Sequence, residues 1–433
     1  MNTAFLLNSL WVMVSSVLVI LMIGGFILLE TGSTRMKNAG HIAGKTILAF
    51  GISSIVFWAV GFGLIFGKGN ALIGLSKFLY SGYDIGGIQL SGSVFFMFQL
   101  AFAGISLTVA FGGFAERAKL ASYLVFALLF SVFVYPPIAH WIWGGGWLSE
   151  YGQQDFAGST VVHLTGAMAA LAATILLKPR IGKFNKDGSA NQIDGHNQVF
   201  TALSVLLLWV GWFGFNAGST LSADAGFFGF VSLNTNLAAA AGTISALIIS
   251  WIVLGKADVP MMLNGSLAGL VAITASCAFV ETWAAVVIGL IAGILVFYSI
   301  RFFEKKGIDD PIFALSVHGT AGVWGTLSTG FFATKELATI GKPGLFYGGG
   351  FEQLGVQALG VAASGLYAFV VSYVLLLVVK YVIKGLRVTE EEEIIGLDMS
   401  EHGSYGYPEL LRSENLQGDQ KLNTVDTKKA IIQ

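Results

Sequence analysis

The feature that most constrains this chain is a series of eleven apolar runs, each long enough to cross a membrane as a helix. A spanning helix needs roughly 20 mostly apolar residues. The chain is 55% hydrophobic and only 11% charged, whereas a soluble domain is about a quarter charged. The runs lack the sustained alternation of membrane-barrel strands. The sequence therefore predicts an all-α polytopic membrane protein with helices near residues 8–30, 44–66, 93–113, 120–142, 157–177, 197–219, 229–254, 258–280, 283–303, 311–333 and 353–383.

Composition and motifs exclude several other classes. A net charge of −1 argues against a nucleic-acid binder. Cys277 is the single cysteine, so no intrachain disulfide can form. The sequence has no phosphate-binding glycine loop, no paired cysteines and no His-x-x-x-His spacing, so it indicates no enzyme, no cofactor and no metal site. The first run lacks the basic segment and cleavage site of a signal peptide, so we expect it to remain as the first helix.

The positions of lysine and arginine predict how the chain is oriented. The loops after the odd-numbered runs hold thirteen of these residues, and the loops after the even-numbered runs hold four. Because positively charged loops stay in the cytoplasm, we expect the N-terminus outside and the C-terminus in the cytoplasm. This arrangement requires an odd number of spans and fits eleven.

A repeated spacing of one aspartate and one histidine points to an internal symmetry. Asp155 precedes His163 by eight residues in DFAGSTVVH, and Asp310 precedes His318 by eight in DPIFALSVH. In the predicted orientation the first helix runs inward and the second outward. Each histidine lies ~12 Å along its helix, so the two approach the midplane from opposite sides. We expect residues 8–178 and 197–333 to be inverted repeats with a site at their interface.

The remaining segments complete the predicted organisation. Residues 1–384 would form the transmembrane domain, with the eleventh helix at 353–383 outside the repeats. Residues 385–433 would form a cytoplasmic tail that is acidic and mixed in composition, and from about residue 411 its polar character predicts disorder. Glycine pairs four residues apart predict close helix contacts rather than a ligand site; they are Gly214 and Gly218, Gly265 and Gly269, and Gly289 and Gly293.

His163 and His318 are the strongest candidates for function. Ionisable side chains inside a membrane are costly and usually functional. Imidazole titrates near neutrality, and each ring can donate and accept a hydrogen bond, so the pair could line a passage for a small polar solute. The structural alternative is two buried histidines, each bonded to a backbone carbonyl or a hydroxyl. The mirrored positions favour the functional interpretation.

The two aspartates each allow two interpretations. An aspartate before an apolar run, with Ser159 and Thr160 in the first turns, is a good helix cap. At the predicted outer edge, Asp155 could also raise the local cation concentration or orient a pore mouth. We expect Asp155 to contribute to function and Asp310 to be structural.

Aromatic residues are dense toward the predicted outer face. Trp143 begins the string WGGGW, Phe102 lies in the third run and Phe215 in the sixth. Aromatic faces can replace part of a cation's hydration, worth ~0.5–2 kcal/mol, although most such residues form interfacial belts or core packing. Asn216 and Ser219 could serve helix packing or contact a solute.

At these residues the sequence resembles the ammonium transporters of the Amt/Mep/Rh superfamily, from the first helix to about residue 408. The tryptophan of the outer aromatic cluster makes the chain similar to members of the Amt branch rather than to those of the Rh branch. The strings that carry the resemblance are DFAGSTVVH at 155–163, WVGWFGFNAGS at 209–219, DDPIFALSVHGTAGVWGTL at 309–327, AERAKL at 115–120, WGGGWL at 143–148 and GLRV at 385–388.

The resemblance implies roles for particular residues. His163 and His318 match the family's twin pore histidines, and Phe102 and Phe215 match the stacked aromatic gate above them. Trp143, Ser219 and Phe102 match an outer ammonium recruitment site, Asp155 matches an aspartate needed for ammonium recognition, and Thr274 is similar to a threonine near that site.

The resemblance also implies partners. The family forms homotrimers with one pore per subunit in the lipid bilayer of the cell (inner) membrane. The string GLDMSEHGSYGYPE resembles a cytoplasmic regulatory tail, and the cytoplasmic face of bacterial relatives docks a PII-type regulator. Residues 409–433 extend beyond the family's tail pattern.

These observations lead to one mechanistic hypothesis and three alternatives. Because an intact cation is costly in an apolar pore, ammonium would bind outside, lose its proton and cross as ammonia. The proton would follow through the histidine pair, or through a water chain near it, and rejoin the ammonia inside. The alternatives are a passive ammonia or carbon dioxide channel, an ammonium receptor, and an intramembrane metalloenzyme using His163, His318 and Asp155. Two histidines are too few for a closed metal site.

Overall fold

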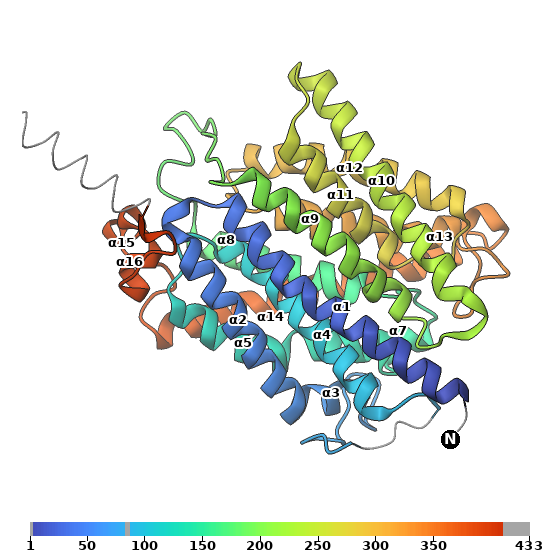
Figure 1. The fold of residues 1–433 in the computed structure, drawn as a ribbon. Coiled ribbons are helices and arrows are strands. Elements are labelled where there is room, and N and C mark those ends of the chain that lie inside the picture. The colour runs from blue at the N-terminus through green and yellow to red at the C-terminus, as the bar shows by residue number, and fades with distance from the viewer. Residues whose placement is uncertain (1–2, 83–86, 410–433) are drawn as a thin grey trace, which may run out of the picture.

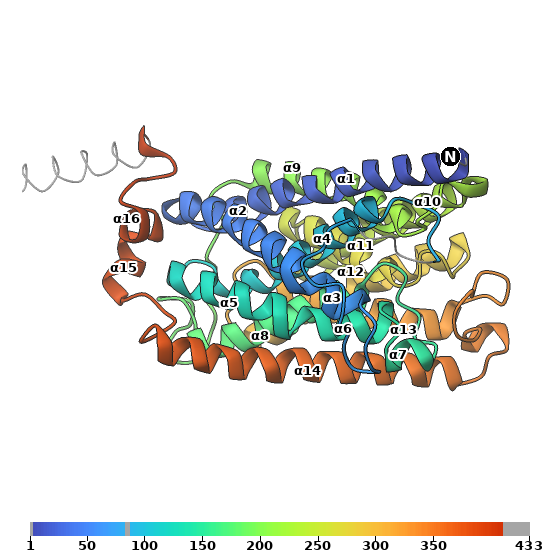
Figure 2. The same cartoon turned by 90° about the horizontal axis from the view of Figure 1, so that it is seen from below.

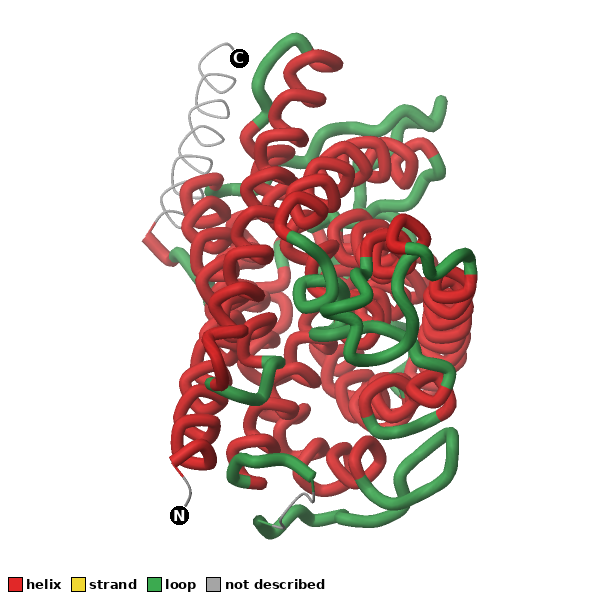
Figure 3. Tube along the Cα trace, turned by 90° about the vertical axis from the view of Figure 1, so that its right-hand side faces the viewer, coloured by secondary structure: helices red, strands yellow, loops and turns green. Residues whose placement is uncertain are grey.

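The protein is a bundle of helices in the computed structural model, which describes residues 3–82 and 87–409. No β-strand occurs in this part of the chain, so the all-α membrane fold is confirmed (Figures 1 and 3). The α-helices are α1 (Thr3–Ser33), α2 (Ala39–Val56), α3 (Phe62–Phe66), α4 (Gly92–Phe111), α5 (Leu120–Phe133), α6 (Tyr135–Trp143), α7 (Trp147–Glu150), α8 (Thr165–Leu177), α9 (Gln198–Trp212), α10 (Phe227–Leu254), α11 (Val259–Thr274), α12 (Thr282–Lys305), α13 (Ala321–Phe332), α14 (Glu352–Val382), α15 (Glu390–Ile395) and α16 (Leu397–His402).

Short turns of other helical types join or extend these helices. Four are π-helical: η2 (Phe57–Gly61), η4 (Ser159–Leu164), η5 (Phe213–Ala217) and η7 (Leu315–Thr320). Four are 3₁₀ turns: η1 (Met36–Asn38), η3 (Gly112–Phe114), η6 (Asp224–Gly226) and η8 (Leu345–Tyr347).

Nine helical stretches within the described residues are long and apolar enough to cross a membrane, and α11 is a shorter apolar helix. The predicted run 311–333 is built from the six-residue turn η7 and the 12-residue helix α13. The protein is therefore a multi-pass membrane protein, while the count of eleven spans stays a prediction. The predicted disorder beyond about residue 411 concerns residues outside the described part of the chain.

Local sequence explains where several helices begin and end. The run 120–142 is divided into α5 and α6 because Pro136 and Pro137 stand at the start of α6 and have no N–H to continue the hydrogen bonds of α5. Asn197 caps α9 by accepting a hydrogen bond from the backbone N–H of Phe200 at 3.0 Å. Asp258 caps α11 in the same way through Met261 at 2.8 Å.

The long helices pack along one another in the bundle. Helix α1 packs against α4 and α9, and α10 packs against α11 and α12. The long helix α14 lies along one side of the bundle, against α8 and α13 (Figure 2). The N-terminus lies at one end of the bundle and the tail helices α15 and α16 lie at the other (Figures 1 and 2).

The glycine pairs on α11 and α12 mark close helix crossings, as the sequence predicts. A Cβ atom added at Gly265 or Gly293 would overlap the backbone carbonyl of Gly242 on α10. One added at Gly289 would overlap the carbonyl oxygen of Ala238. These contacts bring the helix backbones close together, with only small side chains such as those of Ser245 and Ala246 beside them, which is how small residues stabilise helix packing in membranes.

We predict that Gly289→Ala destabilises the protein by about 1–3 kcal/mol, the usual cost of overpacking, because the new methyl group would force α12 away from Ala238. The thermal unfolding of purified protein in detergent would measure this change. The matched control is Gly229→Ala on α10, where a Cβ meets no atom within 4 Å. Equal melting temperatures for the two variants would contradict the proposed close contact.

Candidate functional site

A column of aromatic rings runs through the middle of the bundle. The ring of Trp143, at the end of α6, meets the ring of Phe102 on α4 edge-on, with centroids 5.9 Å apart. Phe102 stacks on Phe215 of turn η5 with centroids 4.0 Å apart and an interplanar angle of 24°. Phe215 lies 5.6 Å from the ring of His163, and His163 lies 5.1 Å from His318. These five side chains, scattered over 217 positions of the sequence, form one continuous column.

The two histidines touch at the centre of this column. Their rings are nearly parallel, at 15°, and the two Nδ1 atoms are 3.1 Å apart. His163 is fully buried and His318 is 3% exposed. One Nδ1 must carry the hydrogen and the other must accept it, so two neutral rings here hold opposite tautomers. The Nε2 atom of His163 is buried and has no hydrogen-bond partner among the described residues, which leaves it free to bond a small solute.

Three residues of the column lie on π-helical turns. His163 lies on η4, Phe215 on η5 and His318 on η7. Such turns are rare and often occur at functional sites. The wider turn changes the direction in which side chains leave the helix, so it helps to bring the rings into one line.

Asp155 accepts hydrogen bonds from the backbone at the start of the turn that carries His163. Its Oδ1 accepts a hydrogen bond from the N–H of Gly158 at 2.9 Å, and its Oδ2 accepts from the N–H groups of Thr160 and Val161, each at 2.9 Å. The backbone carbonyl of Asp155 accepts a hydrogen bond from Nε1 of Trp143 at 2.7 Å. The carboxylate is thus occupied by the start of η4, and the aspartate connects that turn to the tryptophan.

Ser219 and Thr274 have different surroundings. Ser219 is half-buried, and its hydroxyl donates to the carbonyl of Phe215 at 2.8 Å. Thr274 is fully buried at the end of α11, donates to the carbonyl of Leu270 and accepts from Nε1 of Trp212 at 2.8 Å. The structure therefore attaches Thr274 to the packing around His163 rather than to the rings of Trp143 and Phe102.

Trp212 is a member of the site that was not among the residues selected from the sequence. Its ring stacks on that of His163 with centroids 5.1 Å apart and an angle of 19°. It also lies 5.7 Å from Phe215. The sequence could have indicated this role, because Trp212 lies three residues before Phe215 in the string WVGWFGFNAGS. That spacing places the two side chains at neighbouring positions on one helix face.

Asp310 caps the turn of His318, as expected. Its Oδ2 accepts a hydrogen bond from the N–H of Leu315 at 2.7 Å. The ring of His318 also lies 6.1 Å from that of Phe26 on α1, at the end of the column away from Trp143.

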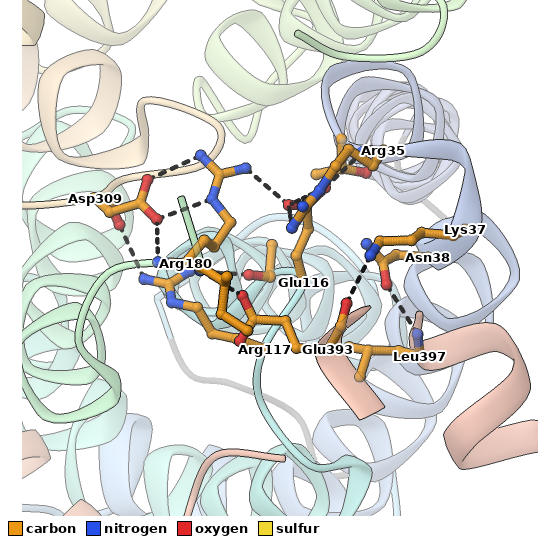
Figure 4. A network of polar contacts seen from close by, with 12 residues as sticks. Arg35, Lys37, Asn38, Glu116, Arg117, Arg180, Asp309, Glu393 and Leu397 are labelled. Atoms are coloured by element: carbon orange, nitrogen blue, oxygen red, sulfur yellow. Dashed lines mark hydrogen bonds and ion pairs between the residues drawn. The ribbon is translucent and has the colours of Figure 1, made fainter. Parts of the chain in front are cut away.

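A network of buried ion pairs lies beyond that end of the column (Figure 4). The guanidinium of Arg180 donates two hydrogen bonds to Asp309, from Nε to Oδ2 at 2.9 Å and from Nη2 to Oδ1 at 2.8 Å. Its Nη1 is 2.9 Å from Oε2 of Glu116, which also pairs with Arg35 at 2.7 Å. The side chains of Glu116 and Asp309 are fully buried. The guanidinium of Arg180 therefore joins the loops after α4, α8 and α12.

These pairs keep both carboxylates ionised. Burial alone would raise the pKa of Glu116, but the charges of Arg180 and Arg35 hold it at about 2. Burial likewise opposes ionisation of Asp309, and its hydrogen bonds and charge interaction with Arg180 lower its pKa to about 2. A depressed pKa adds stability above the ordinary value near 4, and the contribution is lost as the pH falls through the folded value.

The tail is bound to the same network. Glu393 of α15 pairs with Arg387 at 2.6 Å and accepts a hydrogen bond from the N–H of Ile181 at 2.8 Å. Nζ of Lys37 donates to the carbonyl of Glu393 at 2.6 Å, and Asn38 accepts from the N–H of Leu397 at 2.9 Å (Figure 4). The tail helices are thus held by the loops at this end of the bundle.

Comparison with known proteins identifies relatives across almost the whole chain. Residues 10–407 match the model of the Ammonium Transporter Family. Ammonium transporter Amt2 of Archaeoglobus fulgidus is 42% identical over 95% of this chain and 91% of that protein. An ammonium transporter of Bacillus subtilis is 38% identical over 92% of this chain and 97% of that one. Among solved structures, a protein described as Sensor Amt Protein matches with a TM-score of 0.88 and 41% identity, covering 93% of this chain and 99% of the other.

We predict that Arg180→Ala destabilises the protein by about 3–5 kcal/mol, because it leaves buried carboxylates without their main counter-charge. Thermal unfolding in detergent would measure the loss. Since Glu116 and Asp309 stay ionised well below neutrality in the native protein, their contribution to its stability should be the same at about pH 6 and about pH 8.

The control is Lys342→Ala, which removes an exposed pair with Glu352 and should cost less than about 1 kcal/mol. Similar losses in the two variants would show that the buried network is not the main source of stability at this end of the bundle.

Proposed function

The chain belongs to the ammonium transporter family, and from this premise we propose that it moves ammonium nitrogen across a membrane through the column of rings. The observation that carries the proposal is the continuous series from Trp143 through Phe102, Phe215 and His163 to His318, with neighbouring centroids 4.0–5.9 Å apart. A cation site, a closed apolar gate and two buried imidazoles follow one another in the order that such transport requires.

Recruitment of ammonium would take place at the Trp143 end of the column. The faces of Trp143 and Phe102 can attract a cation, and Ser219 would offer its hydroxyl oxygen. Asp155 supports this site by holding Trp143 through its backbone carbonyl and by adding negative charge beneath it. Thr274 would contribute indirectly, through its hydrogen bond with Trp212.

Ammonium would lose a proton before it passes the gate formed by Phe102 and Phe215. An isolated ion in an apolar medium costs on the order of tens of kcal/mol by continuum estimates, whereas neutral ammonia avoids this cost. The two stacked phenyl rings are fully or almost fully buried, so they exclude a hydrated cation. Ammonia would then exchange hydrogen bonds with the histidines as it passes.

The histidine pair would carry the proton that ammonium leaves behind. A chain of water molecules would bring the proton past the gate. When Nδ1 of His163 holds the shared hydrogen, its free Nε2 can accept that proton. The shared hydrogen then moves to Nδ1 of His318, and the hydrogen on Nε2 of His318 leaves on the far side. Each imidazole ends neutral after one proton has entered and one has left, so one positive charge accompanies each ammonia molecule and transport is electrogenic.

The proposed orientation places the Trp143 end outside and the Arg180 end in the cytoplasm of the cell (inner) membrane. The distribution of lysine and arginine supports it, as does the position of the N-terminus and the tail helices at opposite ends of the bundle. Net transport would run from outside to cytoplasm. We also propose a homotrimer and a PII-type regulator at the cytoplasmic loops and tail, both on the family resemblance.

Two other functions fit the same family. A passive ammonia or carbon dioxide channel would use the gate and pore but would carry no charge. A receptor would bind ammonium and signal through the docked tail, an idea favoured by the match to a protein described as Sensor Amt Protein. Ammonium-evoked currents in proteoliposomes separate these functions, because only the proposed transporter produces a sustained current.

We predict that His163→Ala abolishes the ammonium-evoked current, because no proton can then pass from the gate to His318. The current would be measured on proteoliposomes with matched amounts of folded protein. The control is His196→Ala, which removes a histidine of the loop before α9 and should leave the current unchanged. A native-sized current in the His163 variant would exclude the relay, and an absent current in the native protein would exclude electrogenic transport itself.

A further inference from the structure

Helix α14, which lies along one side of the bundle (Figure 2), carries a fully buried amide, that of Gln357. Its Oε1 accepts a hydrogen bond from the backbone N–H of Gln154 at 2.8 Å, and its Nε2 donates to the backbone carbonyl of the same residue at 2.6 Å. A second hydrogen bond, from Nε2 of Gln353 at 3.1 Å, completes the acceptor capacity of this Oε1. One side chain of α14 thus holds both hydrogen-bonding groups of one backbone residue in the loop before η4.

This pairing also fixes the orientation of the amide of Gln357. The reversed amide would place its NH₂ group against the N–H of Gln154 and its oxygen against the carbonyl oxygen of Gln154. Both contacts would be repulsive, and the backbone of Gln154 would lose both partners. The link between α14 and the loop is therefore specific to a side chain that has one donor group and one acceptor group at its end.

The same amide reaches α13. Nε2 of Gln357 donates to the backbone carbonyl of Thr326 at 2.9 Å and contacts the hydroxyl of Thr329. The hydroxyl of Thr326 lies 2.6 Å from that of Thr160 on turn η4. Gln357 therefore connects the loop before η4 with α13 and, through α13, with η4 itself.

Gln154 stands directly before Asp155, the residue that supports the proposed cation site. The backbone carbonyl of Asp155 accepts from Nε1 of Trp143 at 2.7 Å, and its carboxylate caps η4. Two residues later in the chain, the N–H of Ala157 donates to the carbonyl of Thr274 at 3.1 Å. Asp155 thus lies between two fixed points of the backbone, one held by α14 and the other by the end of α11.

We propose that Gln357 is a positioning residue of the cation site: its amide fixes the backbone of Gln154, and thereby places the carbonyl of Asp155 that holds the ring of Trp143. The inference rests on the proposed function and adds to it a residue that acts through the backbone. A polar side chain inside a membrane protein is costly unless it is hydrogen-bonded, and a fully bonded one makes its surroundings rigid. This assignment gives a role to α14, the helix that lies outside the predicted repeats.

The test compares Gln357→Leu with the native protein by the ammonium-evoked current in proteoliposomes, normalised to folded protein. Leucine suits a buried helix position but leaves the N–H and the carbonyl of Gln154 without this partner. The ammonium concentration that gives half-maximal current should rise about three- to tenfold, the effect of one lost hydrogen bond on an equilibrium. The maximal current should stay within about twofold of the native value, as expected when only binding is weakened.

The matched control is Asn8→Leu, which removes another buried amide that joins a helix to loops. Asn8 of α1 donates to the carbonyl of Gln89 at 3.0 Å and accepts from the N–H of Ala223 at 2.9 Å. Neither loop carries Trp143 or Asp155, so the half-maximal concentration should be unchanged. Equal shifts in the two variants would reduce the effect to a general loosening of the fold and overturn the assignment.

Two further results would decide against the proposal or against the function on which it rests. A lower maximal current with an unchanged half-maximal concentration in Gln357→Leu would show a purely structural role and overturn the assignment. A native protein that gives no ammonium-evoked current would instead overturn the proposed function, and this result is obtained before any variant is compared.

A second variant, Gln357→Asn, covers the case in which the leucine variant does not fold. Asparagine keeps a polar amide but is one methylene shorter, so it cannot pair with both groups of Gln154 while α14 stays in place. Its half-maximal ammonium concentration should also rise above that of the native protein. A native value in this variant would overturn the assignment.

Discussion

The contact between Nδ1 of His163 and Nδ1 of His318, 3.1 Å long, is the interaction on which the rest of the column of rings depends. It joins turns η4 and η7, which are far apart in the sequence, and it fixes opposite tautomers on the two rings. Three neighbouring features hold the two imidazoles nearly parallel: the π-helical turns that carry them, the ring of Trp212 stacked on that of His163, and the aspartates that cap each turn.

The surroundings of this contact explain why the two ends of the pore differ. Toward Trp143, Phe215 and Phe102 close the column with stacked rings, and the charge of Asp155 is directed to backbone N–H groups. Toward Arg180, the column ends at His318 and Phe26, and the buried ion pairs of Arg180 lie beyond them. The buried ion pairs at this end are costly to desolvate, and they connect the loops after α4, α8 and α12. The tail helices α15 and α16 are attached to the loops at the same end.

Much of this arrangement follows from the sequence, and the rest depends on tertiary packing. The apolar runs and the matched spacing of Asp155–His163 and Asp310–His318 indicate the fold class and the central residues, because both are set by local periodicity. The π-helical turns, the stacking of Trp212 and the attachment of Thr274 to that ring are not predictable in this way, because they arise where helices from distant segments meet. That Oδ1 of Asp310 is buried without a hydrogen-bond partner among the described residues can be seen only from the structure.

The measurement that tests the central claim most directly is the number of elementary charges moved per nitrogen atom. Vesicles containing the native protein would be supplied with ¹⁵N-labelled ammonium, and the current and the accumulated label would be recorded together. We expect one positive charge for each nitrogen that enters, since every ammonia molecule is accompanied by a proton through His163 and His318. Accumulation of label without any current would contradict it.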